Sequence, residues 1–299
     1  MTNYNFYHQS SESMIDVKSD SIALTVTSPP YWNSIDYDTF SEHGKQKNYR
    51  TRTYANGFQS SDDDGYIEYL YWCNSIFNEV YRVTKPGGFC AIVIGTILLN
   101  GRYFATPHDL LGRLIGEDPK WIFHQDIIWN KVTAGIRRAG VAIQKPYPGY
   151  FYPNIMTEYI HILRKPGDPI YRDINGQKQS SAYPIDELFK KDIANNIWHI
   201  APVPPGIIDH PCPFPEEIPD RIIRLYSYKG DTVLDPFLGS GQTAKVAVDL
   251  GRKAIGYEVE KKYIELSERR IREPSKIRKH QLVMTPRFSK VSVNRGELL

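Results

Sequence analysis

The stretch TVLDPFLGSGQT (residues 232–243) decides the fold class of this chain. A short apolar run ends at Asp235, a turn with two glycines follows, and the residues from Gln242 to Leu250 have the spacing of a helix. In a doubly wound α/β sheet, the glycines of such a unit let the backbone approach a ligand, and the N–H groups of the helix face it. The stretch therefore predicts a parallel sheet with a ligand-binding turn.

The next strand along the chain ends in an acid that suits the same site. Residues 253–257 (KAIGY) form a short strand, and Glu258 follows it, where a carboxylate usually binds ribose hydroxyls. A purely structural turn is the alternative, but the strand, glycine turn, helix, strand and acid together favour a cofactor that contains adenosine. Asp235 would repel a pyrophosphate and suits a cationic amino group better.

Strands and helices alternate along most of the chain. We expect strands over 21–27, 89–94, 121–129, 159–163, 232–234 and 253–257. We expect helices over 62–83, 106–115, 215–228 and 242–250, and a last helix that follows the strand 253–257 and ends at residue 271. This alternation predicts an α/β fold with a doubly wound, Rossmann-like sheet that is mostly parallel and has one antiparallel edge strand. The core comprises residues 1–165 and 211–272, an inserted segment with six prolines spans 166–210, and a basic tail spans 273–299.

Composition places the chain among folded proteins without membrane spans or metal sites. Of its 299 residues, 41% are hydrophobic and 24% are charged, which excludes a disordered or collagen-like chain. The longest apolar stretch, Phe89–Leu99, is far shorter than the ~20 residues that a bilayer requires, and no secretory leader is visible. The three cysteines lie far apart, so we expect neither a disulfide scaffold nor a zinc site, and a cytoplasmic location.

Positive charge is concentrated in three segments. Residues 43–61, 131–145 and 269–299 carry net charges of +4, +4 and +7, whereas the whole chain carries only +3. A solvated surface is the alternative, but tyrosines lie among or beside the cations of the first two segments, a mixture that suits phosphate contact and base stacking. We therefore expect a nucleic-acid partner. The candidate contact residues are Arg50, Arg52, Lys131, Arg137, Arg138 and Lys145.

A second motif, TSPPYW (residues 27–32), follows another predicted strand at the ligand-binding edge of the sheet. Pro29 and Pro30 fix the backbone and remove two donors, so carbonyl groups and the Ser28 hydroxyl can accept hydrogen bonds from an amine. Tyr31 offers a face on which a flat heterocycle can stack. The alternative is that this motif is only a proline-rich end of a strand with no role in the reaction. The position of the motif relative to the cofactor turn disfavours this alternative.

Together, TSPPYW and DPFLGSGQT resemble the DNA amino-methyltransferases of bacterial restriction–modification systems, in the permuted beta group whose catalytic motif precedes the cofactor motif. The resemblance covers roughly residues 6–165 and 210–272, and the two motifs are highly specific as a pair. It implies S-adenosyl-L-methionine as cofactor, double-stranded DNA as substrate and a cognate restriction endonuclease as a partner. We expect 166–210 to recognise the target, and a monomer and a homodimer both stay open.

The resemblance also implies which residues hold the cofactor. Glu258 would bind the ribose, and Asp235 would lie among the contacts to the methionine part. Where the family often has Gly-Asp near the adenine, this chain has His8-Gln9-Ser10, so Ser10 or a backbone group would recognise the adenine amine. The other implied contacts come from the turn and from HPCPFPEE (residues 210–217), and they are Pro213, Phe214, Pro236, Phe237, Gly239, Ser240, Gly241 and Thr243.

For the reaction, the resemblance and the residue chemistry agree. Ser28, Pro29, Pro30 and Tyr31 would form the catalytic tetrapeptide, in which the Ser28 hydroxyl and the Pro29 carbonyl accept the two amino hydrogens. The nitrogen lone pair then faces the sulfonium methyl, and transfer is direct. The target base must leave the duplex and stack on Tyr31 or Trp32, with residues 33–63 as a candidate lid or DNA clamp.

The identity of the target base and other reaction classes stay open at this point. Ser28 favours cytosine N4, and adenine N6 is the alternative within the resembling family. Methylation at cytosine C5 would need a thiolate such as Cys212, for which a small buried residue in the cofactor wall is the favoured interpretation. An RNA or free-nucleotide substrate and a non-catalytic DNA-binding module are the remaining alternatives.

Overall fold

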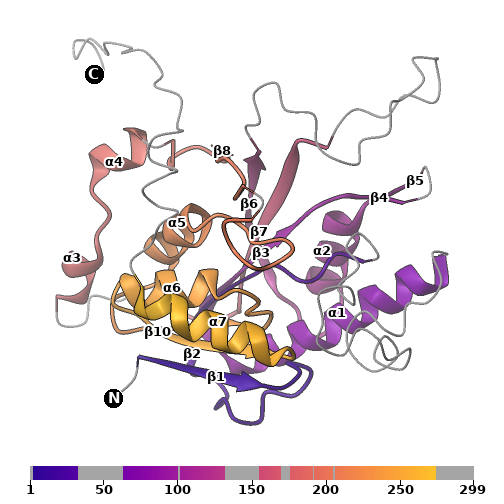
Figure 1. Cartoon of the computed structure of the whole chain (residues 1–299), viewed down its shortest axis with the longest axis horizontal. Helices are drawn as coiled ribbons and strands as arrows, with labels where there is room; N and C mark the ends of the chain where they lie inside the picture. Colours follow the sequence, from indigo (N-terminus) through magenta and orange to yellow (C-terminus); the bar gives the residue numbers. More distant parts are fainter. Residues whose placement is uncertain are drawn as a thin grey trace.

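The computed structural model describes residues 3–32, 63–99, 102–131, 155–169, 176–190, 192–204 and 206–273 (Figure 1). Within these ranges the chain forms an eight-stranded sheet and a separate hairpin of β4 (Ile97–Leu99) and β5 (Arg102–Phe104). In spatial order, the strands of the sheet are β1 (Tyr4–His8), β10 (Lys253–Glu258), β9 (Thr232–Asp235), β2 (Ile22–Thr27), β3 (Thr84–Ile94), β7 (Thr157–Arg164), β6 (Ile122–Asn130) and β8 (Ile197–His199).

The predicted α/β class and the mostly parallel sheet are confirmed, but the position of the antiparallel strand is corrected. Only β7 among the described strands of this sheet is antiparallel to its neighbours, and it lies inside the sheet, between β3 and β6. The two edges are instead formed by β1 and by β8, which consists of three residues of the inserted segment that pair with β6. A strand this short carries no alternation that could identify it in the sequence, so the edge at β8 could not be predicted.

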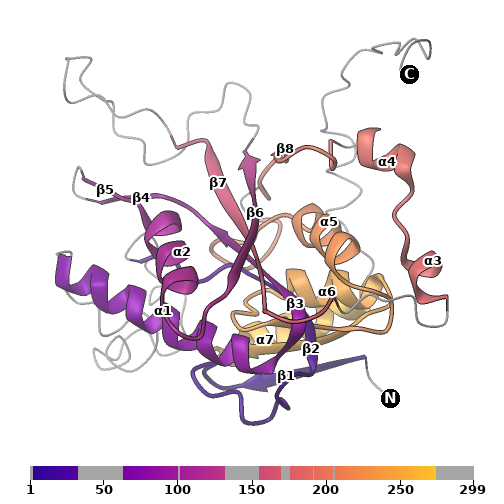
Figure 2. The ribbon, with the colours of Figure 1, turned by 180° about the vertical axis from the view of Figure 1, so that it is seen from behind.

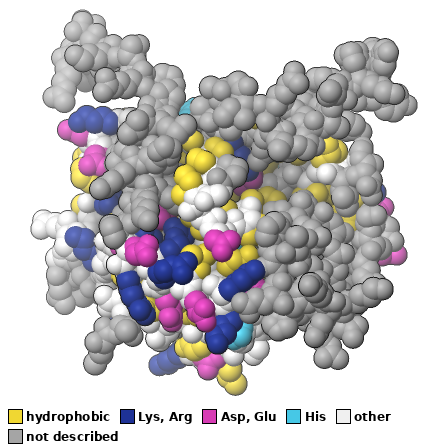
Figure 3. Space-filling model, in the orientation of Figure 1, with side chains coloured by type: hydrophobic (Ala, Val, Ile, Leu, Met, Phe, Trp, Pro, Cys, Tyr) yellow, Lys and Arg dark blue, Asp and Glu magenta, His cyan; other side chains and the backbone are white. Residues whose placement is uncertain are grey.

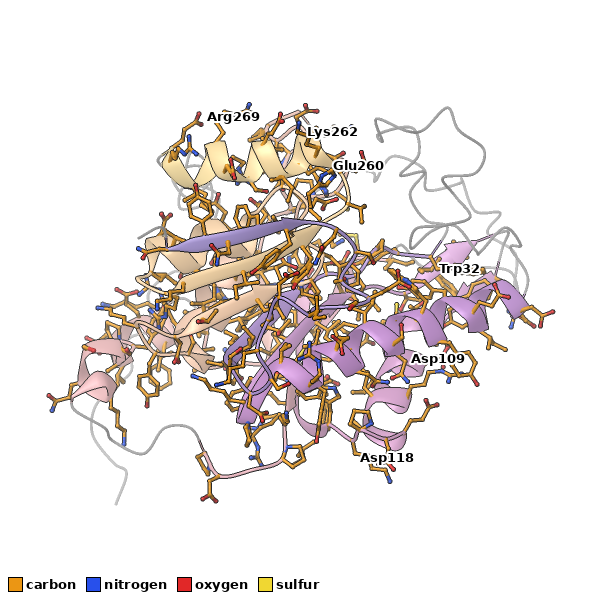
Figure 4. The ribbon with its side chains drawn as sticks, turned by 90° about the horizontal axis from the view of Figure 1, so that it is seen from below. Trp32, Asp109, Asp118, Glu260, Lys262 and Arg269 are labelled. Atoms are coloured by element: carbon orange, nitrogen blue, oxygen red, sulfur yellow. The ribbon has the colours of Figure 1, made fainter. Side chains whose placement is uncertain are left out.

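Helices cover both faces of the sheet, as a doubly wound fold requires. α1 (Asp63–Val83) and α2 (Thr106–Gly116) lie on one face, whereas α5 (Glu217–Tyr226), α6 (Gln242–Asp249) and α7 (Lys261–Arg272) lie on the other (Figure 4). These five helices correspond to the predicted ones.

The core has two parts because successive side chains of a strand point to opposite faces. On β3, Cys90, Ile92 and Ile94 join the cluster under α1 and α2, while Ala91 and Val93 join the cluster under α5 and α6. All five side chains are fully buried. A strand that is buried on both faces therefore reads as a continuous apolar run, as it does here.

The inserted segment is not separate from the core along its whole length. Its described part contains two short helices, α3 (Gln177–Ser181) and α4 (Ile185–Lys190), which stand apart from the sheet in Figure 2. Its last part forms β8 and belongs to the sheet. None of the described helices is long and apolar enough to cross a membrane.

Gly241 is required by the packing of α6 on α7. Its backbone has φ +75°, and a Cβ at this position would lie 2.6 Å from Ser267 Oγ. Gly251 has a similar φ of +76°, but the nearest atom to its Cβ would be Lys229 Cγ at 3.9 Å. Changing Gly251 to alanine therefore adds only backbone strain, about 1–2 kcal/mol.

We expect Gly241→Ala to lower the free energy of unfolding by clearly more than Gly251→Ala, because it adds a collision to the same strain. Urea denaturation of both variants measures the difference. Equal losses would show that α7 moves away freely and that Gly241 is needed only for its φ.

Candidate active site

The carboxyl ends of β2, β9 and β10 open onto one cavity. Because β9 lies between the other two strands, the catalytic motif after β2 and the turn after β9 meet at one edge of the sheet. Most of the predicted catalytic and cofactor residues line this cavity. They are Ser10, Ser28, Pro29, Pro30, Tyr31, Pro213, Phe214, Pro236, Phe237, Gly239, Ser240 and Glu258.

Glu258 is held at the cavity wall by backbone donors. The N–H of Gly239 donates to Oε2 at 2.8 Å, and the N–H of Glu260 donates to Oε1 at 2.9 Å. Burial outweighs these bonds and raises the pKa of Glu258 to about 7. The backbone of Val259 also hydrogen-bonds to this carboxylate. A carboxylate has about four lone-pair sites, so the group can still accept a hydrogen bond from a ligand hydroxyl.

Gly239 allows the turn to pass close to a histidine. Its φ is +49°, and a Cβ would lie 2.8 Å from Nε2 of His210. The ring of His210 also packs edge-on against Tyr263 of α7. Burial lowers the pKa of His210 to about 4, so the ring is neutral at pH 7 and adds no positive charge to the cavity.

Asp235 does not line the cavity, which corrects its predicted role as a direct contact to a cationic amine. Its carboxyl is 2% exposed and accepts hydrogen bonds from Thr27 Oγ1 at 2.7 Å and from the N–H of Phe237 at 3.1 Å. Burial raises the pKa of Asp235 to about 6. The side chain reaches sideways to the neighbouring strand β2, a direction that spacing along the sequence does not contain.

Thr243 and Gly241 also lie beneath the turn rather than in the cavity wall. Thr243 is 1% exposed, and its hydroxyl donates to the carbonyl of Val26 at 3.0 Å. Gly241 faces Ser267 of α7 instead of a ligand. Together with the bond from Thr27 to Asp235, the bond from Thr243 ties the strand of the catalytic motif to the cofactor turn.

The first five residues of the segment HPCPFPEE line the cavity. Phe214 is fixed by its carbonyl, which accepts a hydrogen bond from Gln242 Nε2 at 2.6 Å. Cys212 also lines the cavity, but it is exposed, contrary to the expectation of a small buried residue. His210 and Gln242 also line the cavity and lie within the two predicted segments, although they were not named as contacts. Trp72 of α1 is a cavity residue that the sequence analysis missed.

The catalytic tetrapeptide lies directly after β2. Ser28, Pro29, Pro30 and Tyr31 all line the cavity. The Tyr31 hydroxyl lies within hydrogen-bonding reach of the Glu158 carboxylate and of the Ser28 hydroxyl. Burial, together with the nearby charge of Glu158, raises the pKa of Tyr31 well above its usual value.

The prediction of Lys131 as a DNA contact is corrected, because the structure places this residue in the cavity wall and buries it. It is 6% exposed and forms an ion pair with Glu158, which is 7% exposed. Lys131 follows β6, and Glu158 is the second residue of β7. In the sequence, Lys131 and Glu158 are seen only as charged residues, one just after the predicted strand 121–129 and the other just before the predicted strand 159–163. The register in which β6 pairs with β7 brings the two together, and the sequence does not contain that register.

The prediction that Trp32 stacks on a target base is also corrected, because its ring is buried in the core. It is 2% exposed, and its ring packs against Tyr66 of α1 and Phe104 of β5, at centroid distances of 5.2 and 4.7 Å. Figure 4 shows Trp32 beside α1, on the opposite side of the sheet from α7. Tyr31 remains as the aromatic side chain of this motif that lines the cavity.

The other predicted DNA contacts, namely Arg50, Arg52, Arg137, Arg138 and Lys145, lie outside the described residues. On the described surface over α6 and α7, Lys and Arg side chains alternate with Asp and Glu (Figure 3). Positive and negative side chains are therefore mixed on this described part of the surface. No group of three His, Cys, Asp or Glu side chains in the described ranges could hold a metal ion.

Comparison with known proteins agrees with this geometry. Residues 22–269 match the N6/N4 methyltransferase family that is described as DNA methylase. The type II methyltransferase M.MjaI of Methanocaldococcus jannaschii is 31% identical over 288 aligned residues, which cover 90% of this chain and 91% of that protein. The type II methyltransferase M.SmaI of Serratia marcescens is 28% identical and covers 87% of both chains.

Solved structures show the same fold. TTHA0409 of Thermus thermophilus, crystallised with S-adenosyl-L-methionine, has a TM-score of 0.66 at 26% identity and covers 90% of this chain and 93% of that chain. The cytosine-N4-specific PvuII DNA methyltransferase has a TM-score of 0.63 at 20% identity and covers 95% of this chain and 91% of that chain. The chain therefore belongs to the DNA methylase family of N6 and N4 methyltransferases.

Proposed function

We propose that this protein transfers a methyl group from S-adenosyl-L-methionine to the N4 amino group of a flipped-out cytosine in double-stranded DNA. One observation carries this proposal. The Ser-Pro-Pro-Tyr segment and the cofactor turn line the same cavity and are joined by the hydrogen bonds from Thr27 to Asp235 and from Thr243 to Val26. A donor of the methyl group and its acceptor would therefore meet in one place.

S-adenosyl-L-methionine is the cofactor, and the cavity residues fit it. The Glu258 carboxylate lines the cavity and, beside its backbone donors, can still accept a hydrogen bond from the ribose. Gln9 and Ser10 offer polar groups for an adenine edge, and Phe237, whose ring lies 5.7 Å from that of Trp72, offers an apolar wall. TTHA0409, which is similar along most of this chain, binds the same cofactor in its crystal structure.

Ser28 and Pro29 supply the acceptors that the reaction needs. The lone pair of an exocyclic amino nitrogen is delocalised into the ring, which makes this nitrogen a weak nucleophile. When the Ser28 hydroxyl and the Pro29 carbonyl accept its two hydrogens, the lone pair is directed out of the ring plane, toward the cofactor. The bound cofactor supplies a methyl group on a cationic sulfur. The nitrogen lone pair forms the new N–C bond, and the electrons of the broken S–C bond stay on sulfur. The nitrogen then releases one proton.

Two further points support the cytosine assignment and the cellular setting. Ser28 stands at the first position of the tetrapeptide, where serine leans to cytosine and aspartate to adenine in the resembling family. M.MjaI and M.SmaI are both designated type II methyltransferases, which supports a role in a restriction–modification system beside an endonuclease of the same site. In this proposal, the basic segments and the 166–210 insertion contact the DNA and select its sequence.

Methylation of long DNA that carries no prior methylation tests the proposed function. The protein is incubated with methyl-labelled cofactor and DNA long enough to contain most short sites, and the digested nucleosides are analysed by mass spectrometry. We expect labelled N4-methylcytosine, which is lost in Ser28→Ala. Label in N6-methyladenine would refute the cytosine assignment, and label in 5-methylcytosine would refute amino-group transfer. Absence of label with retained DNA binding would favour a non-catalytic DNA-binding module.

A further inference from the structure

Four polar groups form a continuous chain at the wall of the cavity. The Tyr31 ring and the Glu158 side chain meet beside Gly95, and the Tyr31 hydroxyl lies within hydrogen-bonding reach of both the Glu158 carboxylate and the Ser28 hydroxyl. Glu158 is in turn paired with the Lys131 ammonium. The residues come from the end of β2, from β7 and from the end of β6, and all four line the cavity.

The chemistry of the four groups gives this chain of contacts one direction. Lys131 can only donate, and a carboxylate paired with an ammonium can only accept. The Tyr31 hydroxyl therefore donates its hydrogen to Glu158, and its oxygen is left to accept a hydrogen bond from Ser28. Once the Ser28 hydrogen is directed to Tyr31, the lone pairs of Ser28 Oγ are free for a donor in the cavity.

We infer that Glu158 and Lys131 are positioning residues that, through Tyr31, hold the Ser28 hydroxyl as a hydrogen-bond acceptor for the target amino group. This inference rests on the proposed function, in which Ser28 accepts an amino hydrogen. Without the ionised pair, the Tyr31 hydroxyl could turn and donate to Ser28. The Ser28 hydrogen would then be free to point toward the amino nitrogen, where it would compete for the lone pair that must attack the methyl group.

The surrounding sheet holds this pair in place. On the neighbouring strand, Trp129 pairs with Glu158, and the N–H of Lys131 donates to the carbonyl of Met156 at 2.9 Å. The Lys131 ammonium also lies 4.7 Å from the ring centre of Trp129. At Gly95, a Cβ would lie 3.1 Å from Glu158 Cγ and 3.2 Å from Tyr31 Cε2, so glycine leaves the room in which the two side chains meet.

A buried ion pair is a poor way to stabilise a fold, because the loss of solvation offsets most of the attraction between the charges. Apolar side chains of similar size would serve the packing of β6 and β7 at least as well. The position of the pair against Tyr31, at the wall of the cavity, points to a role in the reaction instead.

The test uses the full chain and separates this role from folding. Glu158→Gln alone leaves a buried, unpaired Lys131 and is expected to lower the thermal midpoint. The double variant Lys131→Met with Glu158→Gln removes both charges and is expected to regain most of the wild-type midpoint. We expect kcat to stay about tenfold lower in the double variant, the loss of one oriented hydrogen bond, with the Kd for S-adenosyl-L-methionine within twofold of wild type. Recovery of kcat together with the midpoint would overturn the inference.

A double-mutant cycle tests whether the effect passes through Tyr31. Tyr31→Phe keeps the ring but removes the hydroxyl that links Glu158 to Ser28. We expect the two charge-removing changes to lower kcat no further when they are added to Tyr31→Phe. Additive losses would overturn the link. If the wild-type protein methylates an amino group and the two charge-removing changes leave kcat unaltered, this inference alone is refuted. If the wild-type protein methylates no amino group, the proposed function is refuted and this inference with it.

Discussion

Ser28→Ala is expected to lower kcat by about 100- to 1000-fold, the loss that follows removal of one acceptor or donor aimed at a transition state. Ser28 lies directly after β2 and lines the cavity opposite the cofactor turn. In the proposed function its hydroxyl accepts one amino hydrogen, an interaction that strengthens as the nitrogen becomes positively charged. The Kd for S-adenosyl-L-methionine, measured by calorimetry, should stay close to the wild-type value because Glu258 and the turn are unchanged.

Ser21→Ala is the matched control for this experiment. Ser21 lies just before the same strand, at its opposite end, and its hydroxyl donates to the carbonyl of Lys18 at 2.5 Å. Neither kcat nor the Kd for the cofactor should change. A rise in Kd that parallels the fall of kcat in Ser28→Ala would show that Ser28 shapes the cofactor site and is not an acceptor for the target base.

Glu258→Gln is expected to weaken S-adenosyl-L-methionine binding by about 100-fold, since in the proposed function an ionised carboxylate that accepts from the ribose becomes a neutral amide. The wild-type affinity should also depend on pH. Burial raises the pKa of Glu258 to about 7, so the group is ionised above pH 7 and protonated below it. Because the ribose hydroxyls favour the ionised form, affinity should be highest near pH 8 and fall as the pH drops from 8 to 6.

The pH profile of Glu258→Gln identifies the group that titrates. Between pH 8 and 6.5 we expect the profile of the variant to be flat. Asp235, whose pKa is raised to about 6, remains in the variant and can still change the turn below that pH. Glu265→Gln is a suitable control, because Glu265 on α7 is exposed. A variant that keeps the wild-type slope between pH 8 and 6.5 would show that Glu258 is not the titrating group.

The cofactor turn shows which structural features can be predicted from the local sequence. TVLDPFLGSGQT specifies strand, turn and helix because apolar periodicity and glycine conformation act over a few residues, and the observed β9 and α6 begin within one residue of the predicted elements. Asp235 shows the limit. Its position at the strand end was predictable, but its side chain bonds to Thr27, 208 residues away, instead of lining the cavity.

The sequence by itself determined the class of fold, the order of the two motifs and the functional groups that Ser28, Pro29, Tyr31 and Glu258 offer, because these depend on local patterns and on residue type. Only the tertiary structure decided which of the charged and aromatic residues are available to a substrate. Lys131 and Trp32 follow strands and look accessible in the sequence, yet one pairs with Glu158 and the other packs on Tyr66. Strand order and register fix such contacts, and both arise from pairing between segments far apart in the chain, which no local pattern records.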